Sequence, residues 1–187
     1  IVDVDRDGDF DFNFIKLLTG ANFVMQNNGA GQAMTDVSST YGISSGGFTE
    51  SGAWGDIDLD GDDDVYEACW GCTSKLWINN GAGQAFTEAS STYNLADGSN
   101  SNDTLAIWVD FDNDGDLDIY IIYTGANNKL YQNNGAGQAM TDVTATYGLG
   151  DGTTTHRSAA WFDIDNDGDL DVVLANRSGN NKVYINN

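Results

Sequence analysis

Aspartate recurs in four nine-residue segments at a spacing that suits a hard metal ion. Residues 3–11, 56–64, 110–118 and 163–171 each read Asp-x-Asp-x-Asp-Gly-Asp-x-Asp. Carboxylates at positions 1, 3, 5 and 9, with glycine at position 6, follow the order of oxygen ligands in a calcium loop, and the backbone carbonyl of position 7 would complete the shell. Because the segments offer oxygen ligands without thiolate or imidazole, they favour Ca²⁺ over Zn²⁺ or Cu²⁺.

We number these segments loops 1 to 4 and treat their aspartates as the candidate metal-binding residues. The predicted site residues are Asp3, Asp5, Asp7, Asp9, Asp11, Asp56, Asp58, Asp60, Asp62, Asp64, Asp110, Asp112, Asp114, Asp116, Asp118, Asp163, Asp165, Asp167, Asp169 and Asp171. The alternative is a set of solvated acidic loops, but carboxylates packed this closely would repel without a cation. Up to four Ca²⁺ are expected, which would change the formal charge from −22 to −14. Loop 2 departs from the others by carrying Asp63 at position 8.

The residues around each loop indicate a β-hairpin loop and not a helix-loop-helix site. A helix-loop-helix calcium site needs glutamate at position 12. The residues there are Phe14, Glu67, Ile121 and Leu174. Position 2 is apolar in all four loops, so we expect it to anchor the loop on the core. These residues are Val4, Ile57, Phe111 and Ile164.

The loops belong to a longer internal repeat. Their first residues are 53, 54 and 53 positions apart, and tryptophan stands two residues before each of the last three loops, at Trp54, Trp108 and Trp161. A second marker, Asn-Asn-Gly-Ala-Gly-Gln, begins at Asn27, Asn79 and Asn133, and its first two residues recur at Asn186. A fixed period near 50 residues is typical of solenoids, propellers and arrays.

Each unit contains four short segments that read as strands. In the third unit they are 105–109 before the loop, then 119–123, 129–132 and 139–144 after it, with the hairpin dipeptide Asn134-Gly135 between the last two. The prediction is an all-β fold: a β-propeller-type repeat with four-stranded antiparallel blades. A β-sandwich is the alternative, although it does not require equally spaced turns.

The chain is expected to form one repeat domain over residues 1–187. Its units are 1–53, 54–107, 108–160 and a partial unit, 161–187. Since the first unit lacks the strand before its loop and the fourth lacks its last strand, about three and a half units would form an open arc. Unpaired strands at both ends favour association with further copies of the chain or with flanking blades.

The combined motif resembles a known family over the whole chain. The repeated Trp-x-Asp-x-Asp-x-Asp-Gly-Asp-x-Asp, the hydrophobic strand after it, Asn-x-Leu-Tyr and Asn-Asn-Gly are similar to the FG-GAP/VCBS repeat family. The resemblance implies integrin-α-like β-propellers of extracellular and cell-surface proteins, with calcium held between the strands of a blade. It implies a recognition or scaffolding role and fixes no ligand, since the family includes adhesion receptors, lectin-like proteins and accessory modules of enzymes.

Composition excludes several functional classes. With 7 basic against 29 acidic residues, the chain is unsuited to nucleic acid or to an anionic membrane surface. No apolar run is long enough for membrane insertion. Hydrolysis of phosphate esters would need more Lys and Arg around the phosphate than this chain offers. A glycosidase would need paired carboxylates, and nearly all the candidates are better assigned to calcium. The single histidine, His156, is expected on the surface. We therefore expect a non-catalytic protein.

Two cysteines and two tryptophans lie outside the repeated motifs. Cys69 and Cys72 could form a thioredoxin-like Cys-x-x-Cys motif, but they align with a turn between two strands, so a local disulfide in an oxidising, extracellular compartment is the favoured interpretation. Trp77 is expected in the core. Trp70 is expected to be exposed, where it could stack on carbohydrate.

The expected function is that of an extracellular or cell-surface, calcium-stabilised module for adhesion, scaffolding or assembly. The alternative is a carbohydrate-binding, lectin-like propeller. Besides further copies or flanking blades, the expected partners are a glycan or a cell-surface protein. Asn102 and Asn176 match the N-glycosylation pattern, at a frequency near chance for an Asn-rich chain.

Overall fold

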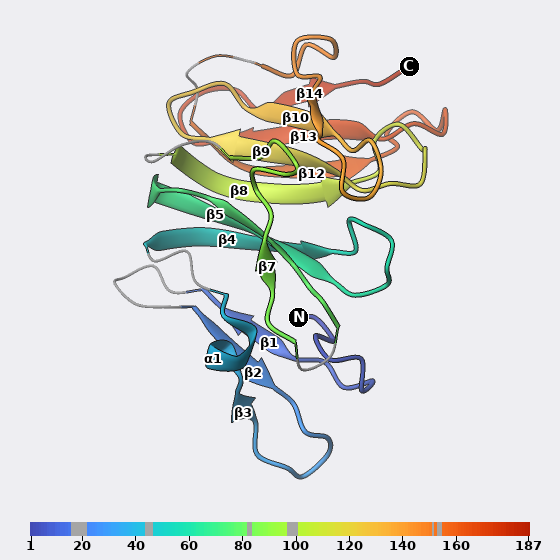
Figure 1. The fold of residues 1–187 in the computed structure, drawn as a ribbon. Coiled ribbons are helices and arrows are strands. Elements are labelled where there is room, and N and C mark those ends of the chain that lie inside the picture. The colour runs from blue at the N-terminus through green and yellow to red at the C-terminus, as the bar shows by residue number, and fades with distance from the viewer. Residues whose placement is uncertain (16–21, 44–46, 82–83, 97–100, 151, 153–154) are drawn as a thin grey trace.

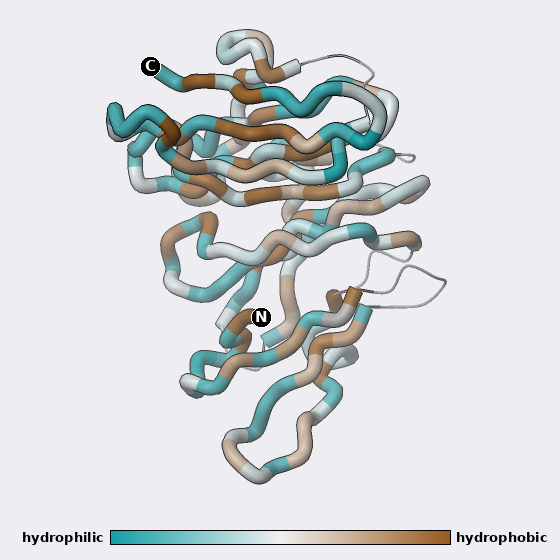
Figure 2. The backbone as a smooth tube through the Cα atoms, turned by 180° about the vertical axis from the view of Figure 1, so that it is seen from behind, coloured by the Kyte–Doolittle hydropathy of each residue, from teal (hydrophilic) through white to brown (hydrophobic). Residues whose placement is uncertain are grey.

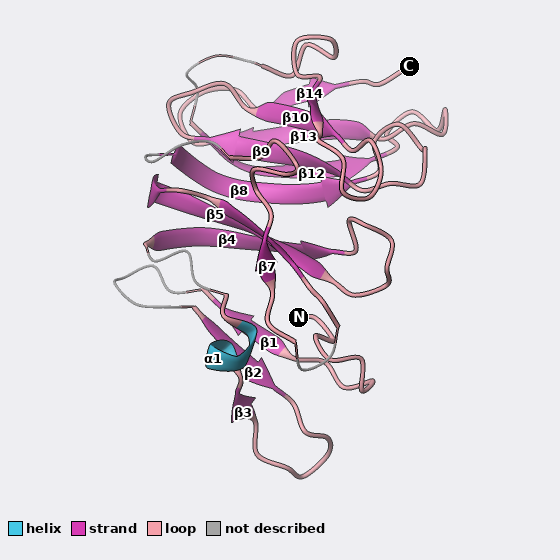
Figure 3. Ribbon diagram, viewed as in Figure 1, coloured by secondary structure: helices cyan, strands magenta, loops and turns pink. Residues whose placement is uncertain are grey.

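The computed structural model describes residues 1–15, 22–43, 47–81, 84–96, 101–150, 152 and 155–187. The regular structure in these ranges is β apart from one four-residue helix, α1 (Figure 3). The structural units are counted from the strand before each acidic loop, because β4, β8 and β12 begin before the predicted unit starts at residues 54, 108 and 161. The first unit contains β1 (Phe12–Phe14), β2 (Phe23–Gln26), β3 (Thr35–Asp36) and α1 (Ser38–Tyr41). The second contains β4 (Phe48–Gly55), β5 (Asp64–Cys72), β6 (Lys75–Ile78) and β7 (Thr87–Glu88). The third contains β8 (Ser101–Val109), β9 (Asp118–Tyr123), β10 (Lys129–Gln132) and β11 (Thr141–Asp142). The fourth contains β12 (His156–Phe162), β13 (Asp171–Asn176) and β14 (Lys182–Tyr184).

The all-β repeat predicted from the sequence is confirmed. Every strand pair within a unit is antiparallel, and the second and third units each have four strands. Within the described residues, the first unit has no strand before its loop and the fourth has none after β14. The units follow one another in an open, curled arrangement, from the blue end to the red end in Figure 1.

Neighbouring units are also joined by hydrogen-bonded strand ends, which the sequence did not predict. The last residues of β5 pair with the start of β8, Trp70 with Asn102 and Cys72 with Ser101, so two units merge into one eight-stranded sheet. An isolated bridge between Thr124 and Thr155 links the third unit to the fourth at the equivalent place. Consecutive sheets therefore converge at the end of the strands that lies away from the acidic loops.

Among the described residues, the core consists of three hydrophobic clusters, each built from two consecutive units. Val4 and Tyr41 of the first unit pack with Val65 and Phe86 of the second. The next two clusters repeat this arrangement between units two and three and between units three and four. Figure 2 shows the corresponding hydrophobic stretches along the strands. Because each unit shares its apolar surface with the next, its strands and loops are held by a neighbour.

In the first three loops, the apolar residue at position 2 inserts into the interface with the following unit. Val4, Ile57 and Phe111 are at most 2% exposed, as predicted. Ile164 is 37% exposed and belongs to none of the hydrophobic clusters. The expectation that all four residues anchor on the core is therefore wrong for Ile164.

The repeated tryptophans lie between consecutive units. Trp108 donates a hydrogen bond from Nε1 to the carbonyl of Ala53 in the preceding unit at 2.9 Å. Trp161 meets the ring of Tyr120 edge-on, with 5.6 Å between the ring centroids. No helix among the described residues has the length and apolar character needed to cross a bilayer.

Candidate metal centres

The four loops share one backbone conformation. Position 4 has a positive φ in each: 58° at Arg6, 60° at Leu59, 58° at Asn113 and 65° at Asn166. The glycine at position 6 also has a positive φ, between 91° and 100°, which a residue with a Cβ adopts only under strain. Asparagine tolerates the left-handed region and explains positions 113 and 166, whereas Arg6 and Leu59 are held there by the fold. Loops 2, 3 and 4 each follow the end of one strand and precede the next, and loop 1 precedes β1; the loops lie along the right side in Figure 1.

This conformation gathers the carboxylates of positions 1, 3 and 9. In each loop, one oxygen from each of three aspartates lies within 4.8 Å of the others. The groups are Asp3, Asp5 and Asp11; Asp56, Asp58 and Asp64; Asp110, Asp112 and Asp118; and Asp163, Asp165 and Asp171. The aspartates of positions 5 and 7, which the sequence also predicted, do not belong to these groups. They are Asp7, Asp9, Asp60, Asp62, Asp114, Asp116, Asp167 and Asp169.

The position-9 aspartate fixes the loop to the rest of its unit. Asp118 is fully buried, and its Oδ2 accepts a hydrogen bond from the backbone amide of Phe111 at 3.1 Å. Its Oδ1 accepts one from the amide of Asn133 at 2.8 Å. Both bonds recur with similar lengths in the other loops, at Asp11, Asp64 and Asp171. The buried carboxylate therefore has both a structural role and a place in the candidate metal group.

The position-5 aspartate turns toward the backbone of its own loop. Oδ1 of Asp114 accepts a hydrogen bond from the amide of Asp116 at 2.9 Å, and the same bond forms at Asp7, Asp60 and Asp167. At position 1, Asp110 accepts a hydrogen bond from the amide of Gly115 at 3.2 Å. Side-chain oxygens thus satisfy backbone donors that a tight loop leaves without a ladder partner.

Several carboxylate oxygens in these groups are buried without a hydrogen-bond partner. They are Oδ1 of Asp3, Oδ1 of Asp56 and Oδ1 of Asp112, one in each of the first three loops. A buried, unpartnered carboxylate oxygen is costly, and a bound cation would compensate it. The donor set is entirely oxygen and is carried on a tight loop, so these residues fit a hard cation such as Ca²⁺.

Burial also raises the pKa values of some of the loop carboxyls. Burial, above all, raises the pKa of Asp64 and that of Asp118 to about 7, and nearby aspartates of the same loops add to the rise. The pKa of Asp112 is raised for the same reasons. Protons and a cation therefore compete for the same buried oxygens.

In the second and third units, the first asparagine of the Asn-Asn-Gly marker bridges two consecutive loops. Nδ2 of Asn133 donates to the carbonyl of Leu117 in its own loop at 3.2 Å and to the carbonyl of Ile57 in the preceding loop at 3.0 Å. Asn79 makes both equivalent contacts, and Asn186 makes the one to the preceding loop. The sequence did not predict this role, although the markers recur in phase with the loops.

Two side-chain contacts connect position 4 of one loop with position 7 of the next. Nε of Arg6 lies 2.9 Å from Oδ1 of Asp62. Nδ2 of Asn113 donates to Oδ1 of Asp169 at 3.1 Å. In loops 2 and 4 the position-7 carboxylate therefore faces the neighbouring loop.

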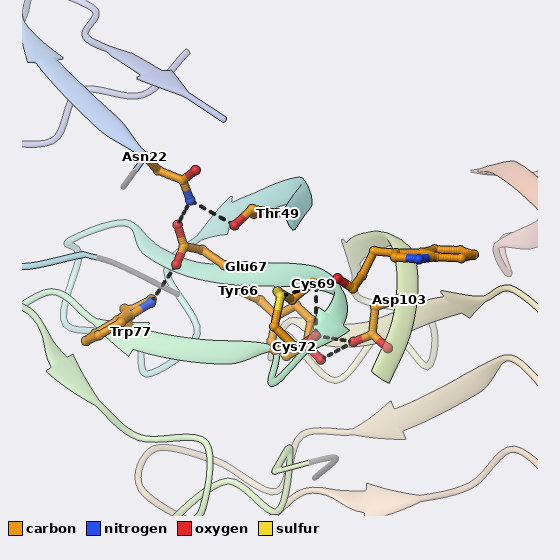
Figure 4. Close-up of a disulfide and its surroundings, with 10 residues drawn as sticks. Asn22, Thr49, Tyr66, Glu67, Cys69, Cys72, Trp77 and Asp103 are labelled. Atoms are coloured by element: carbon orange, nitrogen blue, oxygen red, sulfur yellow. Dashed lines mark hydrogen bonds between the residues drawn. A yellow bond between two sulfur atoms is a disulfide. The ribbon is translucent and has the colours of Figure 1, made fainter. Parts of the chain in front are cut away.

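The structure pairs Cys69 with Cys72 in a disulfide, with 5.4 Å between their Cα atoms (Figure 4). Both lie within the last four residues of β5 and not in the turn after it, because β5 continues to Cys72.

Glu67, at position 12 of loop 2, is fully buried and accepts a hydrogen bond from Trp77 Nε1 at 3.0 Å and another from Asn22. Glu67 is thus a packing residue between the first two units.

Two further expectations have different outcomes. His156 is fully buried, and its Nδ1 lies 3.1 Å from Nδ2 of Asn128, so the surface position expected for it is wrong. Trp77 is 8% exposed and belongs to the core, as expected.

Comparison with known proteins supports the same architecture. Residues 110–174 match the model of the FG-GAP-like repeat family. The chain is also similar to a solved structure of an Agrocybe aegerita lectin that specifically recognises non-reducing terminal N-acetylglucosamine. The two structures have a TM-score of 0.52 and 19% sequence identity, and the match covers 98% of this chain and 50% of the lectin chain. This chain thus spans about half the length of that lectin, and at this identity the likeness concerns the fold. No curated protein matches the sequence. Residues 110–174, which include loops 3 and 4, are an FG-GAP-like repeat.

Proposed function

We propose that the chain is a non-catalytic, calcium-stabilised repeat module. The observation that carries the proposal is the set of buried, unpartnered oxygens on Asp3, Asp56 and Asp112, each within a group of three converging carboxylates. A cation in each loop would offset both the repulsion and the burial of these oxygens. We extend the ligand set to the other aspartates of the four loops as proposed contributors to the shell.

Thermal unfolding with and without calcium tests this proposal. Removing calcium with EGTA should lower the melting temperature markedly, since each loop would then hold uncompensated carboxylates. Adding back Ca²⁺ should restore it, whereas Mg²⁺ should restore it poorly, because Mg²⁺ requires a tighter octahedral shell and dehydrates reluctantly. An unchanged melting curve after verified removal of calcium would contradict a structural role for the ion.

The module is proposed to act extracellularly or at a cell surface, in adhesion, scaffolding or assembly. The Cys69–Cys72 disulfide supports an oxidising compartment. Among the described residues, β1 and β14 pair on one side only, so strand addition there by flanking blades or further copies is geometrically open. Sedimentation analysis with and without Ca²⁺ tests the assembly: calcium should promote association, and a compact monomer at high concentration in calcium would argue against it.

Carbohydrate binding is the second candidate function. It is supported by the fold-level likeness to a lectin and by the half-buried indole of Trp70, a residue type that stacks on sugars. Glycan arrays probed with the calcium-loaded chain distinguish this function from a purely structural one. Reproducible binding to a group of related glycans supports it, and no binding to any glycan contradicts it.

A further inference from the structure

A small pocket lies at the end of the sheets opposite the acidic loops. Phe48, Glu50, Trp70 and Arg157 line it, and its volume is about 360 Å³. Phe48 and Arg157 stand at or next to the first residues of β4 and β12, whereas loops 2 and 4 follow the last residues of these strands. The pocket is therefore separate from the candidate metal centres, and its volume is within the range of small-molecule sites.

Two aromatic side chains form one wall of the pocket. Phe48 and Trp70 are direct partners across β4 and β5, so their side chains lie on the same face of the sheet. Phe48 is 44% exposed, and Trp70 is half-buried. The equivalent pair is Asn102 and Thr124 in the third unit and Thr155 and Arg177 in the fourth. The aromatic pair is thus a feature of the second unit and not of the repeat.

The disulfide holds the backbone that presents Trp70. Cys69 and Cys72 enclose Trp70 and Gly71, and Gly71 adopts a positive φ of 67°. The pairing of β5 with β8 shifts register between Trp70 and Cys72, so the cross-link spans a bulge. Since a ligand does not have to order a backbone that is already constrained, the cross-link would favour binding on the indole face.

The remaining lining residues supply a hydrogen-bond acceptor and several donors. Glu50 and Arg157 are both exposed, one with acceptor oxygens and the other with a fork of N–H donors. Their charges are opposite, so the pocket does not share the strong negative charge of the chain. An uncharged ligand with an apolar face and adjacent hydroxyl groups would suit both walls.

We propose that Phe48, Glu50, Trp70 and Arg157 form a binding site for an uncharged pyranose sugar. The C–H face of the sugar stacks on Trp70 beside Phe48, and its hydroxyl groups donate to Glu50 and accept from Arg157. This inference rests on the second candidate function above, and it assigns that function to residues outside the metal loops.

The test uses methyl glycosides of glucose, galactose, mannose and N-acetylglucosamine as probes. Saturation-transfer NMR with the calcium-loaded chain identifies the sugar that binds, and calorimetry gives its affinity. Trp70→Ala and Arg157→Ala should each weaken that affinity by about tenfold or more, equivalent to about 1.4 kcal/mol. Phe162→Ala and Arg177→Ala are matched controls, because both residues are exposed and neither lines the pocket; they should leave the affinity unchanged.

The outcomes separate the site from the function. If a sugar binds and only the pocket variants lose affinity, the site is supported. If a sugar binds equally well to all variants, the site is wrong but carbohydrate binding stands. If none of the four glycosides binds the wild-type chain at millimolar concentration while a glycan array is positive, this site is again wrong. If the array is negative as well, both the site and the second candidate function fail.

Discussion

Oδ1 of Asp118 accepts a hydrogen bond from the backbone amide of Asn133, 15 residues later, at 2.8 Å. The same carboxylate closes loop 3, and the side chain of Asn133 reaches the carbonyl of Ile57 in loop 2. One pair of residues therefore links a candidate metal centre, the turn of its own unit and the loop of the preceding unit. The other loops repeat the first of these bonds, so each loop and its Asn-Asn-Gly turn are held together.

Replacing Asp118 should be far more damaging than replacing another aspartate of the same loop. In Asp118→Asn, an amide N–H₂ group would face a backbone N–H in a fully buried position, so one donor loses its acceptor. We expect the free energy of unfolding to fall by about 2 kcal/mol, measured by urea denaturation in calcium. Asp116→Asn, at partly exposed position 7, is the control and should cost clearly less. Equal losses in the two variants would contradict the structural role of position 9.

The stability of the metal-free chain should decrease as pH rises. In the folded state the pKa values of Asp64 and Asp118 are about 7, well above the ordinary value of 3.8 expected in the unfolded chain. The folded state therefore binds these protons more tightly, and the stability that they contribute is complete below the unfolded pKa and is lost as pH rises through 7. In EGTA, the melting temperature should be higher near pH 5 than near pH 8.

A double variant isolates this effect from the general charge of the chain. With Asp64→Asn and Asp118→Asn together, the two titrating groups are gone, so the slope of melting temperature against pH should become shallower. A metal-free wild-type chain whose melting temperature rises from about pH 5 to about pH 8 would show that the sign of the linkage is wrong.

Leu59 occupies a backbone conformation that suits asparagine better. Its φ is 60° and its side chain is 61% exposed, whereas loops 3 and 4 have Asn113 and Asn166 at the equivalent position. Leu59→Asn should raise the free energy of unfolding by about 0.5–1 kcal/mol, because it relieves a left-handed leucine without removing core contacts. The reverse change, Asn113→Leu, should destabilise. No gain in Leu59→Asn would mean that the fold imposes no strain at position 4.

The bridging asparagines should couple neighbouring loops. Asn133→Ala removes the two side-chain bonds to Ile57 and Leu117, so it should lower stability by about 1–2 kcal/mol and weaken calcium binding in both loops 2 and 3. Asn127→Ala, an exposed residue outside these loops, is the control and should change neither. Calcium titration by calorimetry measures the effect; weakening confined to loop 3 would argue against coupling.

Much of this architecture could be predicted because the same short sequence patterns recur in every unit. Phased aspartates, Asn-Gly turns and β-rich segments specify each hairpin, so the four-stranded units and the incomplete end units were predictable. The grouping of Asp110, Asp112 and Asp118 without Asp114 and Asp116 was not, because it depends on the three-dimensional path of the loop backbone.

Contacts between units were harder to predict than contacts within them. The pairing of Trp70 with Asn102 and the burial of His156 depend on how neighbouring sheets converge, and no short-range pattern encodes that. The burial of Val4, Ile57 and Phe111 likewise depends on packing against the next unit, so the different exposure of Ile164 is not visible in the repeated loop sequence. The recurrence of Asn133 at a fixed distance from the loop suggests a repeated role. Its hydrogen bond to the carbonyl of Ile57 in the preceding loop, however, depends on the tertiary structure.

Calcium stoichiometry decides whether the four loops hold cations. Equilibrium dialysis of the purified chain against Ca²⁺, followed by atomic emission analysis, should give close to four ions per chain, one for each group of carboxylates. Asp112→Ala removes one member of the loop 3 group and should reduce the count by about one, leaving the other loops loaded. Less than one bound ion per wild-type chain at saturating calcium would contradict the account.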